Sequence, residues 1–235
     1  MSLLSTRGLT KQFDGLHAVE DVNFDLPDGQ VRALIGPNGA GKTTFVSMLC
    51  GRIRPTRGTV EFAGRDVSAL PAHKRIALGM AYTFQITSVF PRLTVAENVG
   101  LAARRVRLEG EAMRVSQALD RVGLGAHPKA LAGDLSYGHQ RLLEIAMGLA
   151  QEPRLLILDE PTQGLTDAEI DAFKALEREL KAETTILLIE HNMSVVMEVA
   201  DSVTVLDFGK VLAEGPPDAI RADRAVQAAY LGAPA

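Results

Sequence analysis

Apolar and polar residues alternate near the start of the chain with the period of two that is typical of half-buried strands. Residues 22–26 place Val, Phe and Leu alternately with Asn and Asp. The turn sequence Pro27-Asp28-Gly29 follows, and residues 30–35 then end in an apolar run. This order predicts a β-hairpin, and a second alternating segment at residues 59–62 predicts another strand. Residues 1–90 are therefore expected to be rich in strands and partly antiparallel.

The pattern changes at about residue 91. Residues 97–122 are rich in Ala, Leu, Arg and Glu, which favour helix, and apolar residues recur at helical spacing from 142 to 149. Later in the chain we expect strands at 155–158, 185–189 and 203–207 and helices at 167–181 and 193–200. Strands that alternate with helices predict a parallel sheet. We expect one domain, residues 1–235, with an α/β core (1–90 and 151–235) and an inserted helical subdomain (about 91–150).

A glycine-rich segment follows the apolar strand expected at residues 32–35. It fits the phosphate-loop pattern G-x-x-x-x-G-K-[ST] and, with the next threonine, comprises Gly36, Pro37, Asn38, Gly39, Ala40, Gly41, Lys42, Thr43 and Thr44. Glycines let backbone N–H groups point at phosphate oxygens, and the following helix start adds partial positive charge. We expect Lys42 to neutralise the β- and γ-phosphates and the Thr43 hydroxyl to bind Mg²⁺.

Two carboxylates, Asp159 and Glu160, end the apolar strand expected at residues 155–158. Ligands of parallel sheets bind at the carboxyl ends of strands, where the phosphate loop is also expected. We therefore expect Asp159 to reach Mg²⁺, directly or through water, and Glu160 to polarise a water that attacks the γ-phosphate. Taken alone, the pair also fits a strand that ends in a solvated loop.

Composition narrows the class of protein. The 235 residues include 29 acidic and 25 basic side chains, for a net charge of −4, whereas a protein held on nucleic acid by charge is normally basic. The single cysteine, Cys50, excludes an intrachain disulfide, fits a reducing compartment and is expected in the core. The start of the chain does not read as a secretory signal, and no run approaches the ~20 apolar residues that span a bilayer. We expect a soluble intracellular protein that binds no nucleic acid.

Five further segments make the chain similar, over nearly its whole length, to the ATP-binding subunits of ABC transporters. They are Phe84-Gln85 at the Q-loop position, residues 135–141 (LSYGHQR) at the LSGGQ signature, residues 162–166 at the D-loop, His191 at the switch histidine, and Phe13 at the aromatic residue that stacks on adenine. The resemblance implies an α/β fold: a P-loop NTPase (RecA-like) core with an N-terminal antiparallel β subdomain and an inserted α-helical subdomain. It also implies ATP and Mg²⁺ as cofactors.

The resemblance assigns roles to these segments. Gln85 would contact Mg²⁺ and the attacking water, and His191 would hold the γ-phosphate or the water; with Glu160 and Lys42 they make up the implied catalytic set. Ser136, Tyr137 and Gly138 would bind the ATP of the opposite subunit, so that one chain alone does not complete a site. From the residues themselves, we expect Ser136 to cap the helix that runs through residue 149.

Three positions depart from the family pattern: Tyr137 replaces a glycine of many members, His139 a glutamine and Thr166 an aspartate. They put the contacts with the opposite subunit in doubt, but not the fold. Tyr137, the Gly-Leu of the D-loop, residues 189–193 (IEHNM) and the ending 229–232 (AYLG) are similar to the importers of branched-chain amino acids and urea.

The resemblance thus implies a motor subunit that hydrolyses ATP at a dimer interface, with a second copy or a sister ATP-binding subunit. It would drive import of branched-chain amino acids, urea or a related small polar solute through separate permease subunits, served by a solute-binding protein. It would lie peripherally on the cytoplasmic face of the cell membrane. Residues 86–93, with apolar Val89, Phe90 and Leu93, would contact the permease.

Two other classes compete with the transport motor. A soluble ABC ATPase of DNA repair would carry a long coiled coil and one of translation usually carries two cores, neither of which the sequence shows; a cluster-assembly ATPase stays open. A P-loop kinase or GTPase would leave the signature helix unexplained, and no guanine-reading N/T-K-x-D occurs where expected.

Overall fold

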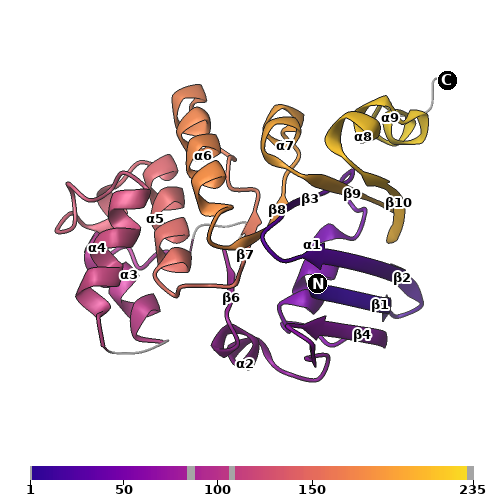
Figure 1. Ribbon diagram of the computed structural model, residues 1–235, viewed down its shortest axis with the longest axis horizontal. Helices are drawn as coiled ribbons and strands as arrows, with labels where there is room; N and C mark the ends of the chain where they lie inside the picture. Colours follow the sequence, from indigo (N-terminus) through magenta and orange to yellow (C-terminus); the bar gives the residue numbers. More distant parts are fainter. Residues whose placement is uncertain (1, 84–87, 106–108, 232–235) are drawn as a thin grey trace. The chain divides into compact units, whose positions relative to one another are not determined.

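The computed structural model describes residues 2–83, 88–105 and 109–231, which divide into two compact units (Figure 1). Unit 1 comprises residues 1–76 and 185–235, and unit 2 comprises residues 77–184. Unit 2 is longer than the helical subdomain expected at about residues 91–150, and it contains two strands besides its helices. The subdomain limits at residues 91 and 150 stay a prediction.

Unit 1 contains an antiparallel sheet in the order β2-β1-β4-β5. Its strands are β1 (Ser2–Phe13), β2 (Leu16–Pro27), β4 (Arg57–Phe62) and β5 (Arg65–Asp66). A two-residue turn, Asp14-Gly15, joins β1 to β2, and both residues have positive φ, as the tight turns of hairpins require. The expected strand at residues 59–62 is confirmed as part of β4.

The expected hairpin between residues 22–26 and 30–35 is wrong. β2 pairs with β1, whereas β3 (Val31–Ile35) is a parallel strand between β8 and β9. All five residues of β3 are buried, as in a strand covered on both faces. The true partner, β1, was hidden because its pairing with β2 shifts register four times, which breaks the period of two.

The second sheet of unit 1 has the order β10-β9-β3-β8. β8 (Thr185–Ile189), β3 and β9 (Ser202–Asp207) are mutually parallel, and β10 (Lys210–Gly215) runs antiparallel to β9. Its core contains Ala33, Ile35, Val196, Val203, Val205, Ile220 and Val226. These residues come from β3 and β9 and from three helices, α7 (Met193–Val199), α8 (Pro217–Ala222) and α9 (Arg224–Leu231). The expected parallel sheet is confirmed.

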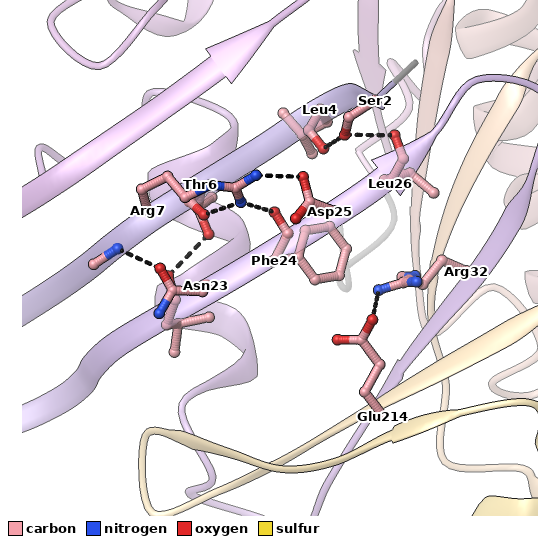
Figure 2. Close-up of polar contacts among 12 residues, drawn as sticks. Ser2, Leu4, Thr6, Arg7, Asn23, Phe24, Asp25, Leu26, Arg32 and Glu214 are labelled. Carbon is pink, nitrogen blue, oxygen red and sulfur yellow. Dashed lines mark hydrogen bonds and ion pairs between the residues drawn. The ribbon is translucent and has the colours of Figure 1, made fainter.

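Polar contacts connect the strands of unit 1 (Figure 2). On the surface, Arg7 of β1 pairs with Asp25 of β2 at 2.8 Å. Arg32 of β3 is buried: it pairs with Glu214 of β10 at 2.7 Å, and its guanidinium lies 5.2 Å from the centre of the Phe24 ring of β2. Arg32 therefore joins the two sheets of unit 1.

The helix after the phosphate loop is α1 (Lys42–Leu49), and a buried arginine closes its end. Arg75 of α2 (Ala72–Ala77) donates to the carbonyls of Met48 at 2.8 Å and Leu49 at 2.7 Å. A cation at this end also suits the helix dipole. Cys50 is buried, as expected.

Unit 2 contains two parallel strands, β6 (Met80–Tyr82) and β7 (Leu155–Asp159). Three helices pack against one another: α3 (Val95–Arg104), α4 (Glu111–Arg121) and α5 (Tyr137–Leu149). A short 3₁₀ helix, Ala132–Asp134, precedes α5, and α6 (Asp167–Leu180) follows β7. Among the described residues, no helix combines the length and apolarity needed to cross a membrane.

Candidate functional site

The phosphate loop of unit 1 runs from the end of β3 to the start of α1 and curls around its own lysine. Lys42 Nζ donates to the carbonyl oxygens of Gly36 at 2.5 Å and Pro37 at 3.1 Å. The lysine head is therefore held inside the loop, where its charge can meet an anion bound by the loop.

Two glycines of the loop lie against other strands of unit 1. A Cβ atom at Gly36 would clash with the carbonyl oxygen of Leu206 in β9, and one at Gly41 with that of Ala18 in β2. Gly41 is also the N-cap of α1, with φ of 99°. Because it has no side chain to accept from the N–H groups of the first turn, these groups suit phosphate oxygens.

The turn between β9 and β10 supports the loop from outside. Gly209 N donates to the carbonyl oxygen of Ala40 at 2.9 Å, and Gly209 O accepts from Glu20 N at 2.8 Å. The turn therefore connects β2 to the phosphate loop. The sequence did not predict this role. Gly209, between the apolar residues of β9 and the strand β10, indicates a turn but not its contact with the phosphate loop.

Phe13 stands at the end of β1 with 44% of its surface exposed. Lys11 Nζ lies 4.8 Å from the centre of its ring and also donates to the carbonyl oxygen of Arg54 at 3.1 Å. An exposed aromatic face of this kind can stack on a flat base.

His191 follows β8 in unit 1, and a buried carboxylate fixes its backbone. Glu190 Oε2 accepts from His191 N at 2.9 Å and from Asn192 N at 3.0 Å. Asn192 in turn caps α7 by accepting from Ser194 N at 3.1 Å. The His191 side chain is 59% exposed. The backbone is thus held while the imidazole stays accessible.

In unit 2, Asp159 is the last residue of β7 and Glu160 follows the strand. Asp159 is buried, its Oδ2 accepts from the Tyr82 hydroxyl at 2.7 Å, and its N–H donates to Thr83 Oγ1 at 3.3 Å. Glu160 has φ of 49°, a left-handed conformation that is uncommon for a residue with a side chain. Such strain is often stored at functional positions.

A buried ion pair lies behind the acidic pair. Arg141 of α5 pairs with Glu144 at 2.8 Å, and it also donates to the carbonyl oxygen of Asp159. Glu144 accepts in addition from Ser88 N at 2.8 Å. Neither Arg141 nor Tyr82 was expected to support Asp159. The sequence signal was the pair of opposite charges, Arg141 and Glu144, three residues apart among the apolar residues of α5.

The signature segment begins α5 in unit 2. Ser136 Oγ accepts from His139 N at 3.2 Å, so the expected cap is confirmed. A Cβ atom at Gly138 would lie 2.6 Å from Glu169 Oε1, and one at Gly164 would lie 2.8 Å from the Tyr137 ring. The signature and the D-loop are therefore in close contact.

The departures from the family pattern fit this contact. Tyr137 lies over Gly164, and Thr166 caps α6 through a reciprocal pair of bonds with Glu169: Thr166 N donates to Glu169 Oε2 at 2.8 Å and Glu169 N to Thr166 Oγ1 at 3.4 Å. The backbone N–H and then the hydroxyl of Thr166 lower the pKa of Glu169. The carboxylate that faces Gly138 is thus held ionised by the D-loop threonine.

Gln85 and residues 86–87 of the expected permease contact lie outside the described residues. Within the rest of that segment, Phe90 is 52% exposed. Its backbone is fixed by buried Asn98, which accepts from Phe90 N at 2.8 Å and donates to Phe90 O at 3.1 Å. The exposed Phe90 side chain thus belongs to a residue whose backbone N–H and carbonyl oxygen are both bonded to Asn98.

The sequence model of the family described as ABC transporter matches residues 19–163, and a model described as branched-chain amino acid ATP-binding cassette transporter matches residues 210–235. The chain is 41% identical to the high-affinity branched-chain amino acid transport ATP-binding protein BraF of Pseudomonas aeruginosa, and 39% identical to the corresponding LivG of Escherichia coli. Each alignment covers 98% of both chains.

Solved structures agree over almost the whole chain. A nucleotide-free ATP-binding cassette from an ABC transporter superposes with a TM-score of 0.91 at 26% identity, covering 99% of this chain and 100% of that one. The ADP conformation of the cassette MJ1267 superposes with a TM-score of 0.88 at 27% identity, covering 99% of each.

Proposed function

Because this chain belongs to the ABC transporter family as an ATP-binding subunit, we propose that it hydrolyses ATP to drive the import of branched-chain amino acids. The phosphate loop, which leads into Lys42 at the start of α1 without a side-chain cap, supports the nucleotide chemistry. Two observations support branched-chain amino acids as the solute. The chain is 41% and 39% identical to two branched-chain amino acid transport proteins, and residues 210–235 match the model of the branched-chain amino acid family.

Unit 1 would bind the nucleotide. Lys42 would exchange the carbonyls of Gly36 and Pro37 for β- and γ-phosphate oxygens, and the N–H groups at the start of α1 would bind the same phosphates. Gly36 and Gly41 leave no space for side chains there, so the backbone can follow the phosphates closely. The exposed face of Phe13 would stack on adenine.

Oxygen groups suited to Mg²⁺ stand in both units, since this hard cation prefers hydroxyl and carboxylate ligands. Thr43, in the first turn of α1, and Asp159, whose carboxylate is oriented by Tyr82, would hold the ion together with Gln85. When bound, Mg²⁺ would supply neutralisation of phosphate charge.

Glu160 and His191 would act on the attacking water. Glu160, on its strained backbone, would take the proton of the water, and the accessible imidazole of His191 would hold the water or the γ-phosphate. The capped N-terminus of α5, with Ser136, Tyr137 and Gly138, would bind the nucleotide of a second ATP-binding subunit, either another copy or a sister chain. Hydrolysis would then require a dimer.

Phe90 and its neighbours would contact permease subunits and hold the protein at the cytoplasmic face of the membrane. The exposed ring on a backbone fixed by Asn98 supports this contact. A solute-binding protein would deliver the solute to the permease subunits on the opposite face of the membrane.

The catalytic assignment is tested with Glu160→Gln and Lys42→Ala. Glu160→Gln keeps the shape of the site but removes the base, so it should bind ATP normally, lose nearly all turnover and accumulate as an ATP-bound dimer in size-exclusion chromatography. Lys42→Ala should weaken nucleotide binding itself in calorimetry. Native turnover in the first variant or native affinity in the second would refute the respective role.

The solute is tested with the complete transporter in vesicles, including its permeases and solute-binding protein. ATP hydrolysis should rise on addition of leucine, isoleucine or valine, and these amino acids should accumulate in the vesicles. Urea and ribose are the comparison solutes. The sequence resembles importers of urea as well as of branched-chain amino acids, and one relative is a ribose import ATP-binding protein. Stimulation by either of them alone would overturn the proposed solute and leave the ATPase assignment intact.

A further inference from the structure

Lys11 lies over the ring of Phe13, the side chain proposed to stack on adenine. Its Nζ atom is 4.8 Å from the centre of the ring. A cation at this distance is attracted to the negatively charged face of an aromatic ring. Because Lys11 occupies one face, a base that stacks on the exposed ring must use the opposite face.

A second contact fixes the position of the ammonium group. Lys11 Nζ donates to the carbonyl oxygen of Arg54 at 3.1 Å, in the segment between α1 and β4. The lysine stem is flexible and its charge is compact, so an acceptor at one place selects one of its conformations. The conformation selected here puts the charge at the Phe13 ring.

The backbone next to Phe13 is bonded to the same segment. Gln12 N donates to Thr56 Oγ1 at 3.1 Å, and Thr56 N donates to the carbonyl oxygen of Thr10 at 2.8 Å. Residues 54–56 therefore hold both the end of the strand that carries Phe13 and the lysine that covers its ring. The ring and the cation are thus placed by one set of contacts within unit 1.

We propose that Lys11 is a positioning residue for the adenine base: it holds the Phe13 ring from one face so that the base stacks on the other. The faces of two aromatic systems both carry negative charge and repel each other when they stack. A cation behind the ring offsets part of this repulsion, because it draws the π electrons away from the base. Lys11 thus acts through Phe13, without contact with the nucleotide, and the inference rests on the proposed stacking of adenine on Phe13.

Lys11→Met tests this role, because it removes the charge and keeps an unbranched side chain. Binding of ADP should weaken by about 2- to 5-fold in calorimetry with Mg²⁺, as expected for the loss of a cation–π contact at an exposed site. Inorganic tripolyphosphate carries phosphates without a base, so its affinity should stay at the native value. Lys11→Arg keeps a cation that can lie over the ring and should restore most of the ADP affinity.

Lys74→Met is the matched control. Lys74 is an exposed lysine of α2 in the same unit, so this variant makes the same change of charge on another element. ADP and tripolyphosphate should both bind to it with native affinity. An equal loss of ADP affinity in Lys74→Met and Lys11→Met would show an effect of net charge alone and would overturn the inference.

Phe13→Leu shows whether the lysine acts through the ring. In a Phe13→Leu background, Lys11→Met should weaken ADP binding no further, because the ring on which it acts is gone. The inference is overturned if Lys11→Met binds ADP with native affinity, if it weakens tripolyphosphate binding as much as ADP binding, or if its effect is the same without the ring. Phe13→Leu alone separates the two levels: native ADP affinity there would refute the proposed stacking, whereas a loss there beside native affinity in Lys11→Met would refute the role of Lys11 alone.

Discussion

Arg141 is a buried charge that joins the signature helix to the end of β7. It pairs with Glu144 and donates to the carbonyl oxygen of Asp159, so one side chain orients a helix and the strand end that carries the acidic pair. Burying an ion pair is costly unless both partners are present, because an uncompensated charge remains when one is removed. The contribution of Arg141 should therefore appear most clearly when it is removed alone.

We expect Arg141→Ala to lower the free energy of unfolding by about 3–5 kcal/mol, because Glu144 is left buried without its cation. Arg104→Ala is the control, since Arg104 forms an exposed pair with Glu111 in the same unit at 2.9 Å and should change stability little. Urea unfolding of both variants measures the difference. Equal, small losses would show that the buried pair does not support unit 2.

Helix starts in unit 2 repeat one capping pattern at two places with different surroundings. Thr94 and Glu97 form a reciprocal capping box on α3, and Thr166 and Glu169 form the same box on α6. Only the second box faces the signature, because Glu169 lies against Gly138. Comparing the two boxes therefore separates the stability lost with a helix cap from an effect on the signature segment.

Thr166→Ala and Thr94→Ala should each lower the free energy of unfolding by roughly 0.5–2 kcal/mol, the usual cost of losing a threonine cap. Only Thr166→Ala should also reduce ATP turnover, because it removes the hydroxyl bond to the carboxylate that faces Gly138 and leaves that carboxylate held by the backbone N–H alone. Turnover that falls equally in both variants would show that the D-loop cap has no special role.

The same box predicts a pH dependence. Thr166 lowers the pKa of Glu169 below its ordinary value, so the ionised carboxylate stabilises the folded protein above that ordinary value of 4.5 and the contribution is lost as pH falls. Thr166→Ala removes the hydroxyl but keeps the backbone N–H, so it should reduce this acid loss of stability only in part, as measured by Tm between pH 3 and 6. An unchanged acid slope would show that the Thr166 hydroxyl does not contribute to the lowered pKa.

Local sequence signals predicted the elements of this fold better than their pairing. The buried strand β8 and the cap of α5 by Ser136 follow from apolar runs and a hydroxyl at a helix start. The partner of β2 did not, because bulges in β1 blur its alternation. The composition of residues 97–122 favoured helix, and two separate helices, α3 and α4, occupy most of this stretch; α4 begins directly after Gly110, which has positive φ.

The candidate site shows the same limit. The phosphate loop and the acidic pair were visible because their spacing is short and local. Contacts such as those of Gly209 with Ala40 and of Tyr82 with Asp159 join residues far apart in sequence, and a single sequence holds no signal for their distance. The close fit between Tyr137 and Gly164 was likewise invisible until the fold brought them together.

For the whole molecule, the proposed mechanism requires one nucleotide to contact both units. The phosphate loop and His191 belong to unit 1, whereas Asp159 and Glu160 belong to unit 2. A ligand that binds only the folded form stabilises what it touches, by about 2.7 kcal/mol at a concentration 100 times its dissociation constant. Binding should therefore slow amide exchange in segments of both units.

Hydrogen exchange of Glu160→Gln with Mg²⁺ and ATP tests this, because the bound nucleotide persists when turnover is lost. Protection from exchange should increase both at residues 36–44 and at residues 158–166. The increase at residues 158–166 should be lost when Asp159 is replaced. Lys42→Ala with the same nucleotide should show neither change. Protection confined to residues 36–44 would mean that the acidic pair does not reach the nucleotide, and Asp159 and Glu160 would lose their proposed roles while the phosphate loop kept its own.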